Sequence, residues 1–239
     1  MAITTETFRD LIIKAAGSNL SSLTAYGSYA SGDRVRNSDI NTILALKDAC
    51  PKELKKISGA IIRWIAAGNP PPLIFAEQAL PESADIFPME FMDIKENNIV
   101  LAGKDIFKTV KVSPANLRLE AEREIQGALM RLRSSYVLSG GSKARIISLM
   151  RDSVSAYAVL LKPLIRLSGK KPPALKKEII AAAPAGAGAD KNFMLEVLAL
   201  KNGNTAGTFR DYESAFERYV KEWEKIRHYA QSIRLTKKR

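Results

Sequence analysis

The sequence has very few of the residues that build sulfur and imidazole sites. Cys50 is the only cysteine and His228 the only histidine among 239 residues. One cysteine excludes an intrachain disulfide and a thiolate metal cluster. One histidine excludes a multi-histidine metal site and argues against a histidine triad. His228 also lies off the apolar stripe of the helix in which it is expected, so we predict an exposed side chain without a catalytic role.

Long apolar runs are missing as well. No run approaches the length of a membrane span, and residues 1–5 lack the basic and hydrophobic blocks of a secretion signal. The hydrophobic content of 46% is typical of a globular protein. We therefore expect a soluble, cytoplasmic protein without a membrane partner, long enough for one large or two modest domains.

Charge is distributed unevenly along the chain. The first 110 residues carry 12 Lys and Arg against 13 Asp and Glu, whereas residues 111–239 carry 25 against 12. A basic second half indicates an anionic partner such as a nucleotide polyphosphate, RNA or an acidic protein, although solvated helix surfaces explain such charges equally well. A local basic cluster flanks a Pro-Pro pair and consists of Lys170, Lys171, Lys176 and Lys177.

The first 110 residues mix helical and strand patterns. Apolar residues at helical spacing, each set followed by a glycine stop signal, predict helices over 8–16 and 51–67. Short apolar runs bounded by turn residues predict strands over 23–26, 40–47, 73–76, 88–94 and 99–101. A Lys-Glu-Asn-Asn turn joins the last two strands, so we expect them to form a hairpin.

The second half has a helical pattern throughout. Apolar stripes predict two long helices, over residues 114–139 and 143–167, and Pro163 is expected to kink the second helix or end it early. Shorter helices follow, and the aromatic-rich stripe of the last one is expected to pack in a core. The predicted fold class is α+β, with a small mixed-sheet α/β domain over residues 1–110 and a basic α-helical bundle over residues 111–239.

A glycine-serine turn lies between the first two predicted strands. Gly27 and Ser28 follow the strand over 23–26, and Asp39 and Asn41 stand around the start of the next strand. Such a turn presents backbone N–H groups and a hydroxyl, which bind phosphate oxygens, beside a carboxylate, which binds Mg²⁺. The segment therefore predicts a site for a metal-bound polyphosphate.

This segment resembles the signature of the DNA polymerase β-like nucleotidyltransferases, in which Gly-Ser and a spacer are followed by Asp, a hydrophobic residue and Asp. Gly27, Ser28 and Asp39 match that signature, and Asn41 replaces its second carboxylate. The second half resembles the helical bundle of kanamycin-type nucleotidyltransferases, which closes over the nucleotide or accepts the second substrate. The resemblance implies transfer of a nucleoside monophosphate from a nucleoside triphosphate to an acceptor hydroxyl, with Mg²⁺ or Mn²⁺ as cofactor.

In that family, paired carboxylates hold two metal ions, and a third acid on a neighbouring strand serves as metal ligand or base. The resemblance therefore implies a metal site of Asp39, Asn41 and Glu90, with Asp93 as the alternative third acid. Residues three apart point to opposite faces of a strand, so only one of Glu90 and Asp93 is expected to reach the metals. Glu90 is preferred because apolar residues flank it early in the predicted strand, as in the family.

The same resemblance assigns nucleotide binding to the loop and its turn. Gly27 and Ser28 are expected to hold the triphosphate, and Arg34 and Arg36 are placed to neutralise phosphate charge. Asn41 keeps an oxygen donor but lacks the negative charge of Asp. This predicts weaker metal binding and impaired catalysis.

Two other functions fit the sequence. Asn41 favours a catalytically silent homologue that binds a nucleotide without turnover, and the basic bundle favours an RNA-binding or partner-binding module. The acceptor stays open among small molecules such as aminoglycosides, proteins and RNA ends. A homodimer is compatible with the sequence.

Overall fold

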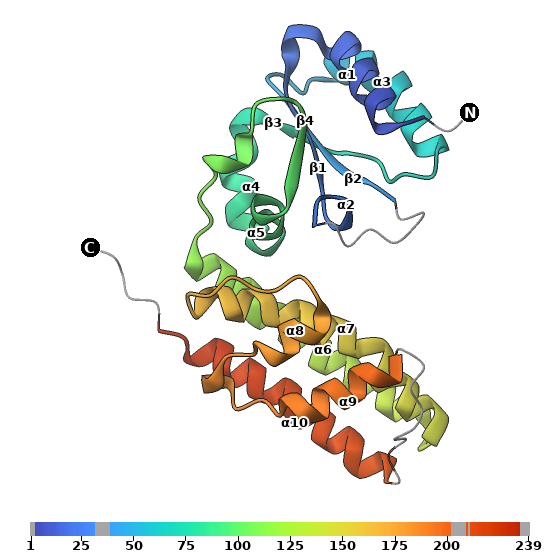
Figure 1. Cartoon of the computed structure of the whole chain (residues 1–239), viewed down its shortest axis with the longest axis vertical. Helices are drawn as coiled ribbons and strands as arrows, with labels where there is room; N and C mark the ends of the chain where they lie inside the picture. The colour runs from blue at the N-terminus through green and yellow to red at the C-terminus, as the bar shows by residue number, and fades with distance from the viewer. Residues whose placement is uncertain (1–2, 32–38, 202–208, 210, 235–239) are drawn as a thin grey trace. The chain divides into compact units, whose positions relative to one another are not determined.

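The computed structural model describes residues 3–31, 39–201, 209 and 211–234 (Figure 1). The chain divides into two compact units, Met1–Ser113 and Pro114–Arg239. Arg34 and Arg36 lie outside the described residues. Within the described ranges, no helix combines the length and the apolarity that a membrane span requires.

The first unit, the α/β unit, is built on one mixed sheet of four strands in the order β3-β2-β1-β4. Strand β1 pairs antiparallel with both β2 and β4, and β2 pairs parallel with β3. The bounds of the strands are β1 Leu20–Tyr26, β2 Asn41–Leu46, β3 Leu73–Ala76 and β4 Asn98–Gly103. A mixed sheet followed by a helical unit confirms the predicted α+β class.

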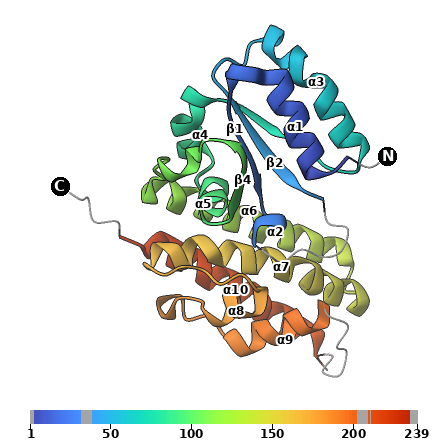
Figure 2. The ribbon, with the colours of Figure 1, turned by 45° about the horizontal axis from the view of Figure 1, so that its top comes forward.

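Helices cover both faces of this sheet (Figure 2). Helices α1 (Thr5–Ala16) and α3 (Pro51–Ala66) pack on the face that carries Leu44 and Leu46. Helices α4 (Leu80–Ile86) and α5 (Pro88–Glu96) pack on the face that carries Ile43 and Ala45. Because both faces are buried, β2 is a continuous apolar run after its first two residues.

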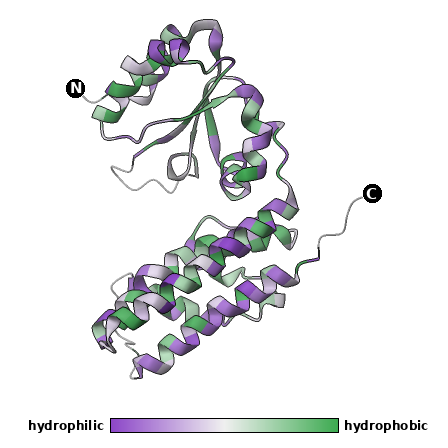
Figure 3. Cartoon of the chain, turned by 180° about the vertical axis from the view of Figure 1, so that it is seen from behind, coloured by the Kyte–Doolittle hydropathy of each residue, from purple (hydrophilic) through white to green (hydrophobic). Residues whose placement is uncertain are grey.

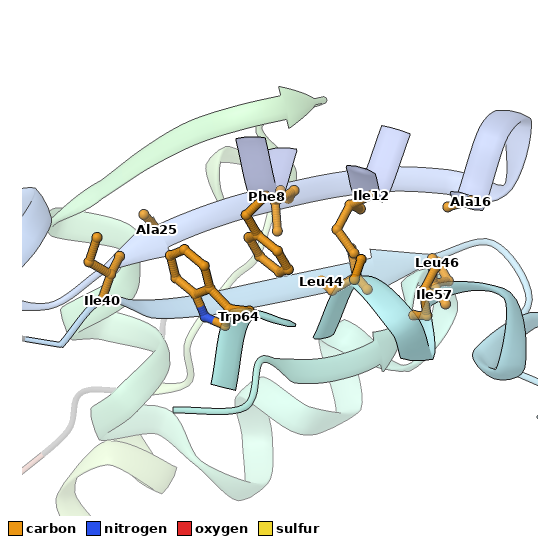
Figure 4. Packing of buried hydrophobic residues seen from close by; sticks show 11 residues of the cluster. Phe8, Ile12, Ala16, Ala25, Ile40, Leu44, Leu46, Ile57 and Trp64 are labelled. Atoms are coloured by element: carbon orange, nitrogen blue, oxygen red, sulfur yellow. The ribbon is translucent and has the colours of Figure 1, made fainter. Parts of the chain in front are cut away.

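The core under α1 and α3 is built around an aromatic pair (Figure 4). The rings of Phe8 and Trp64 stack with centroids 4.3 Å apart and an interplanar angle of 17°. Both side chains are completely buried, and Ile12, Ile40 and Leu44 surround them in the same cluster. This cluster fixes α3 against the sheet.

The segment 88–94, predicted as a strand, is instead the helix α5, so the predicted hairpin is wrong. The buried residues of this segment are Pro88, Phe91 and Ile94, whose spacing of three is helical, and proline stands in the first turn, where a helix tolerates it. Strand β4, which contains the predicted run 99–101, pairs with β1 rather than with the segment before it.

The second unit, the helical unit, contains five α-helices among the residues that the structure describes. Helix α7 packs against the other four, and Figure 3 shows apolar and polar residues following one another along these helices. Their bounds are α6 Pro114–Ser139, α7 Lys143–Leu167, α8 Lys176–Ala181, α9 Lys191–Lys201 and α10 Tyr212–Ser232. Pro163 lies inside α7, which continues to Leu167, so the predicted early end is not observed.

The aromatic residues of α10 lie in the core of the helical unit, as predicted. Tyr219 and Trp223 are completely buried, and Trp223 packs edge-on against Tyr157 with ring centroids 5.2 Å apart. His228 is exposed on the same helix, which confirms the predicted exposure of its side chain. All four lysines of the cluster over 170–177 are exposed.

Candidate nucleotide-binding site

A sharp corner ends β1 at the predicted glycine-serine turn. Gly27 follows Tyr26 with a φ of 76°, and the short helix α2 (Ser28–Ser31) begins at the next residue. The N–H of Ala30 donates to the carbonyl oxygen of Gly27 at 3.0 Å and closes the turn. A positive φ is strained for residues with a Cβ atom, so glycine is required here by backbone conformation.

Asn41 lies against this corner. It is the first residue of β2 and pairs with Tyr26, the residue that precedes the glycine. A Cβ atom built on Gly27 would lie 3.4 Å from the side-chain amide nitrogen of Asn41. The two parts of the predicted motif, 14 positions apart in the printed sequence, are therefore in van der Waals range.

Asp39 lies two residues before Asn41 and is exposed, while Ile40 between them is buried. The carboxylate of Asp39 is thus accessible to solvent at the start of the strand that carries Asn41. An accessible carboxylate can bind a cation, whereas one directed into the apolar core could not.

Glu90 reaches the same end of the sheet from a helix. It lies in the first turn of α5 and is exposed. The pKa of Tyr26 is raised, mainly because its phenol is partly buried and additionally because the negative charge of Glu90 lies near it. Tyr26 immediately precedes Gly27, so the charge of Glu90 acts on the residue next to the corner.

Asp93 lies one helical turn after Glu90 and is half-buried. The strand on which both acids were predicted does not exist, so the expectation that they point to opposite faces is wrong. Residues three apart on a helix lie on neighbouring positions of one side. The helical geometry therefore does not by itself exclude Glu90 or Asp93 as the third acid of the site.

The metal set implied by the family resemblance fits only in part. In the described ranges, no group of three or more His, Cys, Asp or Glu residues is arranged to hold a metal ion. Among the described residues, the motif supplies one carboxylate at this end of β2, from Asp39, and one carboxamide oxygen, from Asn41. Such a pair suits one Mg²⁺ that takes its other ligands from water and phosphate, and it does not suit a two-metal centre.

The sequence alone does not predict two features of this region: the effect of the Glu90 charge on Tyr26 and the hydrogen bond between Asn69 and Ile40. Tyr26 was assigned only to the strand, and Asn69 only to the segment that ends α3. Asn69 accepts a hydrogen bond from the backbone N–H of Ile40 at 3.1 Å, between Asp39 and Asn41. Nothing in the local sequence signals this contact, because the two residues are 29 positions apart.

Comparisons with known proteins support the fold. The sequence matches no family model and none of the curated proteins. Among solved structures, it is similar to spectinomycin adenyltransferase AAD(9) from Enterococcus faecialis, determined with ATP and spectinomycin. The TM-score is 0.50 at 13% sequence identity, over 90% of this chain and 96% of that chain. The chain therefore has the fold of this adenyltransferase. At that identity, the likeness establishes the fold alone.

Proposed function

We propose that the protein is a nucleotidyltransferase that moves a nucleoside monophosphate from a nucleoside triphosphate to an acceptor hydroxyl. The observation that carries this proposal is the corner at Gly27, against which Asn41 packs while Asp39 stays exposed beside it. Its occurrence in a fold shared with an adenyltransferase supports the same reaction class.

Each residue around the corner has a proposed role in this reaction. The backbone at Gly27 and Ser28 receives the polyphosphate, and Asp39 with Asn41 holds one Mg²⁺. When bound, this ion neutralises phosphate charge and orients the α-phosphate and the leaving group. Mn²⁺ has the same ligand preferences and is the natural substitute.

The transfer itself is an in-line displacement. The acceptor oxygen forms a bond to the α-phosphorus, the bond from that phosphorus to its bridging oxygen breaks, and pyrophosphate leaves with the electron pair. The hydroxyl proton goes to a carboxylate, for which Glu90 is the first candidate because its charge lies near Tyr26 at the corner. Asp93 is the second candidate.

Asn41 limits the rate in this scheme. A carboxamide lacks the charge of the aspartate that the family signature has at this position. Loss of one charge-assisted contact costs about 1.5–3 kcal/mol, which corresponds to roughly ten- to a hundredfold in rate or affinity. We therefore propose a slow transferase.

Label transfer tests the proposal. The protein is incubated with α-³²P-labelled ATP, GTP, CTP or UTP, Mg²⁺ or Mn²⁺, and acceptors from three classes: aminocyclitols, RNA ends and proteins. We expect transfer of label to at least one acceptor, faster transfer by Asn41→Asp and none by Asp39→Asn. Absence of transfer by both the wild type and Asn41→Asp, with every acceptor, would overturn the proposal.

A specific observation favours a second candidate, a nucleotide-binding protein without turnover. The described residues do not assemble three acidic side chains at one point, and one of the two motif carboxylates is an amide. For this candidate we expect Mg²⁺-dependent ATP binding with no label transfer in any variant. Label transfer by the wild type excludes it.

A further inference from the structure

We propose that Asn69 is a positioning residue, which holds the Asp39–Asn41 segment in the conformation that binds the metal-bound triphosphate. The inference rests on the proposed function, because it assigns ligand binding to Asp39 and Asn41. Asn69 itself contacts only the backbone of this segment: its side-chain oxygen accepts from the N–H of Ile40 at 3.1 Å.

Among the described residues, the strand pairings of the sheet do not include Ile40. The β1–β2 pairing ends with Tyr26 and Asn41, and the β2–β3 pairing begins with Ile43 and Leu73. Ile40 precedes both ladders, yet it is only 6% exposed. A buried N–H requires an acceptor, and the side chain of Asn69 supplies it.

A second hydrogen bond holds the Asn69 side chain. Its amide nitrogen donates to the carbonyl oxygen of Trp64, at the long distance of 3.5 Å, in the last turn of α3. Trp64 is completely buried and stacks on Phe8, and Figure 4 shows Trp64 and Ile40 in one cluster. The start of β2 is thus tied to a rigid part of the core.

The sequence around Asn69 explains its conformation. Gly68 ends α3 with a φ of 90°, and its N–H donates to the carbonyl oxygen of Ile65 at 2.9 Å. Pro70 follows Asn69 and restricts its backbone to the extended region. Two further prolines lead directly into β3, so the backbone that carries the Asn69 side chain has little freedom.

The hydrogen bond between Asn69 and Ile40 affects the candidate ligands by restricting the backbone that carries them. Asp39 and Asn41 are the residues on either side of Ile40, so fixing the peptide N–H of Ile40 restricts the backbone from which both side chains extend. Groups that orient metal ligands typically change metal affinity or activity by roughly 10- to 100-fold when they are removed. We expect an effect of that size on Mg²⁺-dependent ATP binding.

The chain offers a matched control at the other end of β2. The Asn19 side chain accepts from the N–H of Asp48 and donates to its carbonyl oxygen, both at 2.9 Å. Asn19 is also half-buried, and it fixes the backbone two residues after β2 ends at Leu46. Asn19→Ala therefore removes a side-chain contact to the backbone, together with a hydrogen bond to Glu53 at 3.3 Å, far along the strand from Asp39 and Asn41.

The test is a Mg²⁺ titration of ATP binding, carried out on the full chain by calorimetry. For Asn69→Ala we expect the Mg²⁺ concentration at half-maximal ATP binding to rise by roughly 10- to 100-fold. Asn69→Asp keeps an acceptor oxygen and should restore the wild-type value to within a few-fold. Asn19→Ala should lower thermal stability and leave the Mg²⁺ dependence unchanged.

Three results would overturn the inference: a wild-type Mg²⁺ dependence in Asn69→Ala, an equal shift in Asn19→Ala, or no restoration by Asn69→Asp. If Asn69→Ala does not fold, Asn69→Gln, which displaces the acceptor by one methylene, takes its place with the same expectation. If the wild type binds no ATP, the proposed function fails on its own. Amide hydrogen exchange then still tests the positioning role, since Ile40 should exchange faster in the Asn69 variant and not in Asn19→Ala.

Discussion

The two units of this chain use their carboxylates differently. In the helical unit, Glu222 is 1% exposed, and its two oxygens accept from Lys225 Nζ at 2.6 Å and from the N–H of Asp190 at 2.7 Å. In the α/β unit, Asp39 and Glu90, the candidate site acids, are exposed. A carboxylate whose oxygens are already bonded stabilises the fold, whereas an exposed one is free to bind a ligand. The comparison assigns a structural role to Glu222 and a chemical role to Asp39 and Glu90.

The largest expected effect comes from the core beneath the corner. Trp64→Ala removes a completely buried ring that stacks on Phe8, and such substitutions cost about 3–5 kcal/mol of unfolding free energy. Trp64→Phe keeps an aromatic ring and serves as the control. Both variants leave Trp223 as the sole tryptophan, so its fluorescence reports on the helical unit.

Urea unfolding followed by circular dichroism and by Trp223 fluorescence separates the two units. In Trp64→Ala, we expect the loss of helix signal to begin at lower urea while the Trp223 transition stays in place. A common shift of both signals would contradict the division of stability between the units.

The next effect concerns the missing carboxylate of the motif. Asn41→Asp restores a charge against the Gly27 corner and should strengthen Mg²⁺-dependent ATP binding or transfer by roughly ten- to a hundredfold. Asn192→Asp is the control, because Asn192 is exposed on α9 in the helical unit. Equal gains in both variants would show that added charge alone, and not its place at the corner, causes the change.

Replacing one acid in each unit tests the comparison directly. Glu222→Leu leaves the N–H of Asp190 without its acceptor and should cost about 1–3 kcal/mol of unfolding free energy. Asp39→Leu changes an exposed side chain and should stay within about 0.5 kcal/mol. Chemical denaturation measures both values. A larger loss for Asp39 would give this residue a structural role.

The last effect is confined to alkaline pH. Burial raises the pKa of Tyr219 to about 12, although a hydrogen bond with Ser153 at 2.8 Å lowers it in part. Between pH 10 and that value the unfolded chain loses the Tyr219 proton and the folded chain keeps it. Stability therefore falls as pH rises through this window, by at most about 1.4 kcal/mol per pH unit, and is unaffected below it.

Tyr219→Phe should reduce this alkaline slope. The slope should not vanish, because burial also raises the pKa of Tyr157, with Glu222 as a further cause. Unfolding free energies of the wild type and the variant, compared from pH 8 to pH 11.5, measure the difference. Parallel curves would mean that Tyr219 titrates alike in the folded and unfolded states.

Much of the fold follows from local patterns in the sequence. The strand over 73–76 has the predicted bounds, and the glycine corner follows from a Gly-Ser pair between two apolar runs. Local patterns do not decide whether the segment 88–94 forms a strand or a helix. Its apolar residues, at positions 88, 89, 91, 92 and 94, follow no strict alternation, and seven residues are too few to establish a helical period.

The contacts that complete the candidate site depend on the topology of the chain. Glu90 approaches Tyr26 only because α5 packs on one face of the sheet, and Asn69 reaches Ile40 only because α3 packs on the other. Neither contact has a local signature, since the partners are far apart in the sequence. The motif and the family resemblance therefore predicted Gly27, Asp39, Asn41 and Glu90 as candidates, but not Asn69.

Calorimetric titration of the full chain with ATP and Mg²⁺ tests most directly whether the Gly27 corner binds a triphosphate. We expect the wild type to bind ATP only when Mg²⁺ is present. In Asp39→Asn the affinity for ATP should fall by roughly tenfold or more, because a charge-assisted contact is lost. Glu82→Gln, which removes one charge from the exposed surface of α4, should bind as the wild type does. Absence of binding, or equal affinity of Asp39→Asn and the wild type, would contradict the assignment of this corner.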